Sequence, residues 1–189
     1  MVVSTTISSS PTMVYFGQEV GEAGNENAGF GTHSRTSIFD YIGVPNHQRW
    51  MNGGKFDGGK LSESEKALRD FYKRLLNFSI ESSALMGEYK EIQSVNRKQG
   101  DVYPPGIYAF VRWSEMQKLV VVSNFSWVST SEFELLVPAN TIEIWKLKDG
   151  NYTVVDALYG TKAKLIVKDG TGSIKIKIKP SESFIYELK

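Results

Sequence analysis

Residues 107–125 open with Ile107-Tyr-Ala-Phe-Val-Arg-Trp113 and close with Leu119-Val-Val-Val-Ser-Asn-Phe125. Both runs are rich in β-branched and aromatic residues, which favour β-strands over helices. The stretch Leu119–Val122 is apolar throughout, and a strand that is apolar on both faces is expected in the middle of a sheet. The two runs therefore predict a β domain with a central strand near residues 119–125.

Similar runs continue to the end of the chain and predict strands at Phe133–Val137, Thr141–Leu147, Tyr152–Val155, Ala163–Val167, Ser173–Ile178 and Ser183–Leu188. Asp149-Gly150 and Asp169-Gly170 lie between such runs and are typical of hairpin turns. In Ile174-Lys-Ile-Lys-Ile178, strict alternation puts isoleucine on a dry face and lysine on a wet one. Short antiparallel strands with two inward faces predict a mainly β fold, an antiparallel β-sandwich over residues 80–189.

The N-terminal part has a different character. Thr12-Met-Val-Tyr-Phe16 is a short apolar run ended by Gly17, which predicts a strand buried on both faces, as in a parallel sheet. Ser62 is a good helix N-cap, and Glu65 completes a capping box. Leucine and aromatic residues then recur at helical spacing over residues 68–76, so one amphipathic helix is expected there. The change of pattern places a boundary near residue 80.

Composition excludes several classes of partner. The chain has 189 residues, 22 Lys+Arg against 21 Asp+Glu, and a formal net charge of +1, which favours neither nucleic acid nor an acidic membrane surface. Lys175, Lys177 and Lys179 could form a basic patch, but with this balance we interpret them as a solvated face. Zero cysteines exclude disulfides and thiolate chemistry, and the compartment stays undetermined. No apolar stretch approaches a membrane span.

Several motifs resemble the C-terminal part of the α-amylase family of glycoside hydrolases. Met13-Val-Tyr-Phe-Gly-Gln-Glu19 resembles the end of the family's eighth barrel strand, and Arg35-Thr-Ser-Ile-Phe-Asp-Tyr41 its arginine-led stretch near the substrate cleft. Tyr108–Trp113 and Leu119–Ser126 resemble strands of its trailing β domain, and Pro180–Leu188 resembles the last strand. The order and spacing of these motifs extend over nearly the whole chain.

The resemblance implies two domains. Residues 1–79 would be a remnant of the catalytic (β/α)8 barrel, with its last strand, a long loop and its last helix, and residues 80–189 the C-terminal β-sandwich. Retaining hydrolysis needs an acid/base and a nucleophile carboxylate about 5–5.5 Å apart, which the family carries on its fourth and fifth strands. Neither strand is present in this sequence, so no catalytic residue, no metal ligand and no cofactor are predicted. Calcium binding by the parent enzyme is left open.

Four residues are candidates for the rim of the substrate cleft. The resemblance puts Glu19, Arg35 and Asp40 near the barrel mouth, where charged groups could orient a sugar hydroxyl. A salt bridge that only holds the loop is an equal alternative for each of them. Trp50 could stack on a sugar ring, although a packing role is more common for tryptophan. Trp113, Trp127 and Trp145 lie in predicted strand regions and favour packing, but an exposed row of them would suit glycan stacking.

Three functional hypotheses follow. The first is a C-terminal fragment of an α-glucan-acting hydrolase that cleaves starch or maltooligosaccharides, inactive by itself, with a β-sandwich that stabilises the barrel. The second is a non-catalytic carbohydrate-binding or docking module, and the third a purely structural domain. The expected partners are an α-glucan, through the parent enzyme, and the rest of the barrel, with no nucleic acid and no membrane. The barrel strand at 12–16, as an unpaired edge, would invite self-association.

Overall fold

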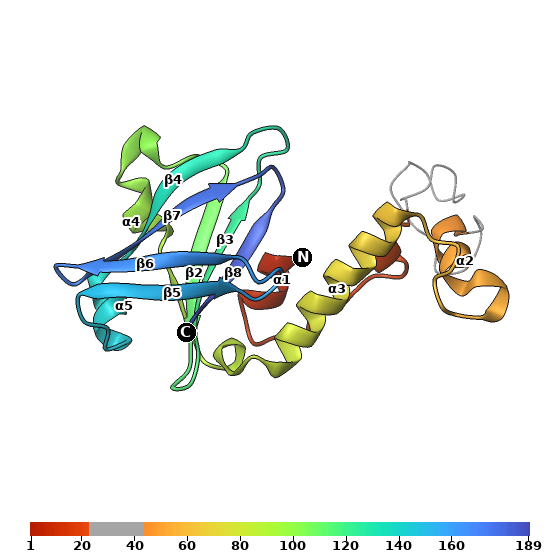
Figure 1. The fold of residues 1–189 in the computed structure, drawn as a ribbon, viewed down its shortest axis with the longest axis horizontal. Helices are drawn as coiled ribbons and strands as arrows, with labels where there is room; N and C mark the ends of the chain where they lie inside the picture. The colour runs from red at the N-terminus through yellow and green to blue at the C-terminus, as the bar shows by residue number, and fades with distance from the viewer. Residues whose placement is uncertain (23–43) are drawn as a thin grey trace. The chain divides into compact units, whose positions relative to one another are not determined.

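A computed structural model describes residues 1–22 and 44–189 (Figure 1). Two compact units form: residues 1–11 with 77–189, called the β unit below, and residues 12–76, called the helical unit. Besides its strands, the β unit contains α1 (Val2–Thr6), η3 (Ser83–Met86), α4 (Gln93–Arg97), η4 (Gly100–Val102) and α5 (Ala139–Ile144). The helical unit contains η1 (Gln18–Val20), α2 (Pro45–Met51), η2 (Asn52–Gly54) and most of α3 (Glu63–Glu81).

One eight-stranded sheet dominates the described part of the β unit, in the order β1-β2-β3-β8-β5-β6-β7-β4. Every neighbouring pair in it is antiparallel. Its strands are β1 (Glu88–Glu91), β2 (Ile107–Trp113), β3 (Lys118–Asn124), β4 (Ser131–Val137), β5 (Gly150–Asp156), β6 (Lys162–Lys168), β7 (Thr171–Ile178) and β8 (Ser183–Leu188). The predicted mainly β, antiparallel fold is confirmed, with the strands joined in one curled sheet (Figure 1).

The curled sheet encloses a single core. Val120 and Val122 of β3 share one hydrophobic cluster with Leu165 of β6 and Ile174 of β7, so the two halves of the sheet face each other. Leu119 and Val121 point the other way and are also fully buried, on the face of β3 that α1 contacts. The prediction of a central strand that is buried on both faces is confirmed.

The alternating strand β7 shows how charge pairing completes the sheet. Its isoleucines are buried and its lysines exposed, as the alternation predicts. Across the ladder, Lys177 lies opposite Glu132 of β4 and forms an ion pair with it, and Lys175 lies opposite Glu134. Opposite charges on cross-strand neighbours stabilise antiparallel pairs. These lysines are therefore balanced by glutamates on a solvated face, and they do not form a basic patch.

Two local predictions in this half of the chain are wrong. Residues 141–147 do not form a strand: α5 covers Ala139–Ile144, with Pro138 at its N-cap, and Thr141, Ile142 and Trp145 bury one helical face. Asp149-Gly150 therefore does not join two strands. The Asp149 carboxylate instead accepts hydrogen bonds from the amides of Asp169 and Gly170, the turn between β6 and β7. That predicted hairpin turn is confirmed, and both of its residues have positive φ (50° and 72°), as a type I′ turn requires.

The strand predicted over residues 12–16 is absent. Met13 and Tyr15 are 85% and 49% exposed, and residues 11–15 have no regular secondary structure. A parallel strand exists only when neighbouring strands satisfy its backbone groups. Within residues 1–22 and 44–189 no strand pairs with this segment. The predicted helix, in contrast, begins after Ser62 and extends from Glu63 to Glu81.

Helix α4 closes the gap between the two edges of the curled sheet. β1 covers only the second half of β2, and Gln93 occupies the remaining edge: its amide donates to the Ile107 carbonyl (2.8 Å) and accepts from the Ala109 N–H (3.2 Å). Asn96, fully buried, does the same for edge strand β4, donating to the Leu136 carbonyl (2.9 Å) and accepting from its N–H (2.8 Å). Two side-chain amides thus replace the missing strand-to-strand ladder.

Replacing Asn96 with alanine should destabilise the β unit by about 2–4 kcal/mol, because this buried side chain no longer satisfies the N–H and C=O of Leu136. Urea unfolding followed by circular dichroism measures the change. Asn151→Ala, at an exposed position of β5, is the matched control and should stay within about 0.5 kcal/mol of the parent chain. Equal effects of the two substitutions would contradict the closing role of Asn96.

Arg112 anchors the N-terminal segment to the sheet. The side chain is 1% exposed, on the face of β2 opposite the core, and burial lowers its pKa. Its guanidinium donates to the carbonyls of Ile7 (2.9 Å) and Thr6 (3.5 Å) at the end of α1. On the other side it donates to the carbonyls of Leu85 and Gly87. The buried cation therefore ties two irregular segments to one strand through backbone carbonyls, which it satisfies in return.

Arg112→Met keeps most of the buried volume but removes every donor, so it should cost about 2–4 kcal/mol and release α1. Hydrogen exchange of the amides in residues 1–7 should accelerate more than exchange in β5 and β6. Arg97 also donates to backbone carbonyls, those of Pro104 and Pro105, but it is exposed. Arg97→Met is thus the control and should cost under about 1 kcal/mol. Unchanged exchange at α1 in Arg112→Met would contradict the anchoring role.

Candidate functional site

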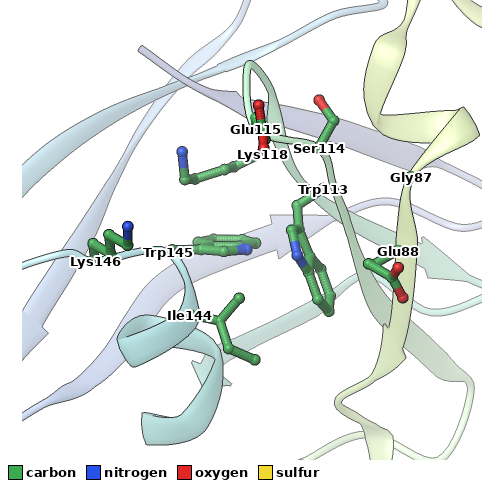
Figure 2. Close-up of a pocket in the computed structure, with 9 residues that line it drawn as sticks. All are labelled: Gly87, Glu88, Trp113, Ser114, Glu115, Lys118, Ile144, Trp145 and Lys146. Atoms are coloured by element: carbon green, nitrogen blue, oxygen red, sulfur yellow. The ribbon is translucent and has the colours of Figure 1, made fainter.

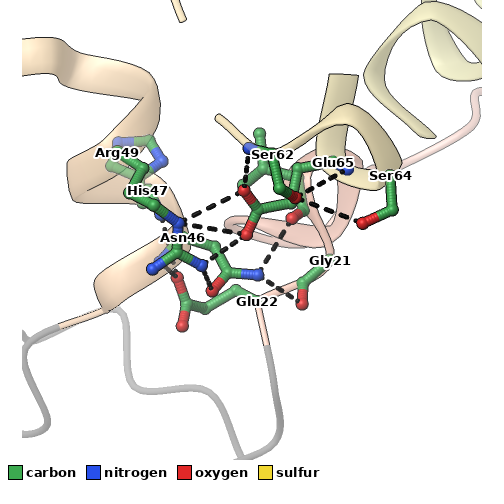
Figure 3. A network of polar contacts seen from close by, with 9 residues as sticks. Gly21, Glu22, Asn46, His47, Arg49, Ser62, Ser64 and Glu65 are labelled. Atoms are coloured by element: carbon green, nitrogen blue, oxygen red, sulfur yellow. Dashed lines mark hydrogen bonds and ion pairs between the residues drawn. The ribbon is translucent and has the colours of Figure 1, made fainter. Parts of the chain in front are cut away.

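A polar network organises the helical unit (Figure 3). The Glu22 carboxylate accepts hydrogen bonds from the amides of Asn46 (2.9 Å) and His47 (3.0 Å), so it caps the first turn of α2. The Asn46 side chain donates to the carbonyls of Val20 (3.1 Å) and Gly21 (2.9 Å). The turn after η1 and the start of α2 are consequently held together by charge-assisted and neutral hydrogen bonds.

Arg49 links α2 to α3. Its guanidinium forms a forked ion pair with Glu65 and also donates to the Asn46 side-chain oxygen. Glu65 accepts a further hydrogen bond from the Ser62 amide (2.7 Å), while the Ser62 hydroxyl accepts from the Glu65 amide (3.3 Å). The predicted capping box is thereby confirmed. The Arg49 hydrogen bond, followed by the Ser62 amide, lowers the pKa of Glu65 from 4.5 to about 2.

This network has a structural character. Each of its charged groups is already paired with a partner inside the unit, which leaves no carboxylate free for acid–base work. Within residues 1–22 and 44–189, no group of three His, Asp or Glu side chains gathers as a metal site. The helices among these residues include none that is long and apolar enough to cross a membrane. The network therefore fixes the shape of the helical unit.

The predicted rim residues remain predictions. Arg35 and Asp40 lie outside the described residues. Glu19 lies in η1 and is half-buried. Trp50 lies in α2, where its ring contacts Phe56 (centroids 5.8 Å apart) and the Arg69 guanidinium lies 5.0 Å from the ring centroid. These contacts give Trp50 a packing role in this unit.

A second candidate site lies in the β unit, at one end of the curled sheet. It is a surface hollow of about 580 Å³ between the end of β2, the start of β1 and the end of α5 (Figure 2). Trp113 and Trp145 line it, and Figure 2 shows the nitrogen-bearing end of the Trp145 ring directed toward Trp113. Small-ligand sites are typically hollows of about 300–1,000 Å³ with aromatic walls and a few polar groups.

The charged residues of the hollow balance one another. Glu88, Glu115, Lys118 and Lys146 line the hollow, so it has two carboxylates and two ammonium groups. The sequence indicates that both tryptophans are packing residues or residues that could stack on a glycan. It does not predict that they line the same hollow. Residues 113 and 145 belong to different elements, and only the fold brings them together. Residues 141–147 were moreover predicted as a strand, which gave no reason to place Trp145 beside Trp113.

The comparison with known proteins bears on the β unit first. Residues 101–189 match the family described as "Alpha amylase, C-terminal all-beta domain". These residues form an α-amylase C-terminal domain. The family resemblance predicted from the sequence motifs is thereby confirmed. The matched range begins after β1 and α4, so the edge strand and the closing helix described above precede it. No curated protein sequence matches the chain.

Solved structures of similar fold are α-amylase-family enzymes. A variant of AmyP in complex with maltotriose is 16% identical, and the match covers 100% of this chain and 33% of that one with a TM-score of 0.60. The maltogenic α-amylase AmyB from Thermotoga neapolitana is 13% identical, and the match covers 99% of this chain and 34% of that one with a TM-score of 0.60. A mutant of the trehalulose synthase MutB is 15% identical, and the match covers 100% of this chain and 37% of that one with a TM-score of 0.52. The chain thus spans about a third of their length.

Glu65 makes the stability of the helical unit depend on pH. Because its folded pKa is depressed, its contribution is fully present above the unfolded value of 4.5 and is lost as the pH falls toward 2. Glu65→Gln should cost about 1 kcal/mol at pH 7, since Arg49 is partly exposed. The difference from the parent chain should shrink between pH 4.5 and 2 in urea unfolding and in amide exchange of residues 44–76. Glu63→Gln, at a 92% exposed side chain, is the control. A constant difference across this range would contradict the assignment.

Proposed function

We propose that this chain is the C-terminal part of an α-glucan-acting glycoside hydrolase, and that its β unit stabilises the catalytic barrel. The observation that carries the proposal is the α-amylase C-terminal domain at residues 101–189. The likeness to AmyP, solved with maltotriose, supports it because it extends over the whole chain, including the helical unit. In this proposal residues 1–79 belong to the barrel and residues 80–189 to the trailing domain.

Exposed apolar residues support the docking of the helical unit on further barrel elements. Met13 and Tyr15 lie in the segment that resembles the eighth barrel strand, and both are exposed. Isolated exposed apolar residues are normal, but these two stand two positions apart, the spacing at which the side chains of a strand share one face. Such a segment would bury them by pairing with adjacent strands of a barrel. Without those strands the same edge could pair between copies of the chain, which is the self-association that the sequence predicts.

The chain alone is proposed to be inactive. Retaining glycoside hydrolysis needs two carboxylates about 5–5.5 Å apart on either side of the scissile bond. In the α-amylase family these residues come from barrel strands that the sequence does not contain. Glu22 and Glu65, the carboxylates of the helical-unit network, are occupied by helix capping and by Arg49. Catalysis would therefore depend on residues outside this chain.

A carbohydrate-binding module is the second candidate function, and the aromatic hollow of the β unit favours it. The two functions are compatible, because sugar binding would use only the residues that line the hollow. A purely structural domain remains the third alternative. It would bind no sugar.

Purified chain incubated with maltopentaose should release no reducing sugar above the buffer blank, because the paired carboxylates are missing. Product formation is measured by reducing-end assay and by chromatography of the oligosaccharides. An active α-amylase in the same buffer is the positive control. Hydrolysis above the blank would contradict the proposed inactivity.

The parent enzyme is tested at the DNA level. We expect the reading frame upstream of the codon for Met1 to encode the missing barrel strands, with an Asp and a Glu at the ends of the fourth and fifth. An upstream frame without such a pair would contradict the hydrolase proposal, whatever the result of the assay.

A further inference from the structure

The hollow at the end of the curled sheet has properties that barrel support does not require. Trp113, half-buried, forms one wall, and Trp145, 4% exposed, lies at its base and belongs to the core. Ile144, next to Trp145, is 51% exposed and adds an apolar surface (Figure 2). Aromatic rings beside open space are suited to the C–H faces of a sugar ring, which is apolar on its faces and polar at its rim.

The charges around the hollow favour a neutral ligand. Two glutamates and two lysines line the hollow, so their formal charges sum to zero. Carboxylates accept hydrogen bonds from hydroxyl groups and ammonium groups donate to them. A ligand that carries many hydroxyls and no charge fits this set of donors and acceptors. An ionic ligand would meet charges of its own sign as well as of the opposite sign among these four side chains.

Close backbone packing and hydrogen bonds hold the walls of the hollow in place. Gly87 lies so close to β2 that a Cβ on it would be 2.0 Å from the Trp113 carbonyl oxygen, and its own carbonyl accepts from Arg112 (3.2 Å). The Ser114 hydroxyl accepts from the amides of Met116 (3.3 Å) and Gln117 (3.2 Å), which fixes the turn after Trp113. A preformed site loses little conformational entropy on binding.

The Trp145 indole N–H provides an independent indication. It is buried and finds no acceptor among the residues that the structure describes. A buried donor without a partner costs free energy, and most such groups in folded proteins are satisfied by protein, water or ligand. The nitrogen-bearing end of the ring is directed toward Trp113, on the side of the hollow (Figure 2). The nitrogen itself is buried, so a ligand hydroxyl would satisfy this donor only after a small shift of the side chains around it.

We propose that the hollow lined by Trp113, Trp145, Glu88 and Lys146 is a non-catalytic binding site for a short α-1,4-glucan segment. The identity of the sugar rests on the proposed function, whereas the preference for a neutral, hydroxyl-rich ligand rests on the hollow itself. Trp113 stacks on a glucose ring. The charged rim binds its hydroxyl groups.

Titration of the full chain with maltotriose tests the site, followed by tryptophan fluorescence and by NMR shifts of the indole N–H groups. The Trp113 and Trp145 indole signals should shift. Trp113→Leu, which keeps apolar volume but removes the aromatic face, should weaken binding about tenfold or more. Trp113→Phe keeps a ring and should lose less than Trp113→Leu. If Trp113→Leu and Trp113→Phe unfold at the same temperature, a packing defect does not explain weaker maltotriose binding by Trp113→Leu than by Trp113→Phe.

Trp127 provides the matched control. It is 87% exposed on the loop after β3, outside the hollow, so Trp127→Leu should bind maltotriose within about twofold of the parent chain. Loss of binding in Trp127→Leu but not in Trp113→Leu would overturn the assignment. Absence of any maltotriose binding would also overturn it, and would leave the proposal of a barrel-supporting domain intact. Binding of cellotriose in preference to maltotriose would overturn the α-glucan assignment.

Discussion

The closure of the sheet edges by two amide side chains is the constraint on which the β unit depends. A curled antiparallel sheet with open edges exposes backbone groups that water or another chain would have to satisfy. Gln93 and Asn96 supply one donor and one acceptor each, the same pair of groups that a neighbouring strand would offer. Because both residues lie on one helical turn of α4, a single short element bonds both edges of the curled sheet.

The same principle recurs wherever irregular segments meet regular ones in this chain. Arg112 satisfies carbonyls at the ends of α1 and η3, and Glu22 satisfies amides at the start of α2. Side chains thus take the place of backbone partners at element ends, where the chain's own ladders stop. Arg112 is buried and Arg49 partly exposed, so removal of Arg112 is expected to have the larger energetic consequence, because its hydrogen bonds to Thr6 and Leu85 are buried.

Sequence patterns were informative where burial follows a fixed period. The alternation of Ile174–Ile178 and the apolar run of Leu119–Val122 predicted strands that the structure confirms, and Ser62 with Glu65 predicted the helix start. The strand predicted over residues 141–147 was wrong. Its β-branched residues favour a strand, whereas Pro138 at the N-cap and the burial of Thr141, Ile142 and Trp145 on one face favour a helix. β1 reads Glu-Tyr-Lys-Glu and has no apolar face to detect. The hollow could not be predicted, because its walls come from distant segments.

The hollow lies where the core of the β unit reaches the surface, and this position links binding to folding. Trp145 packs in the same cluster as the strands of the sheet while its ring also forms the base of the hollow. A ligand that binds only the folded domain stabilises it in proportion to the logarithm of its concentration over its dissociation constant. A sugar bound beside Trp145 would therefore stabilise the folded β unit, so that the midpoint of its unfolding would rise with the concentration of α-glucan.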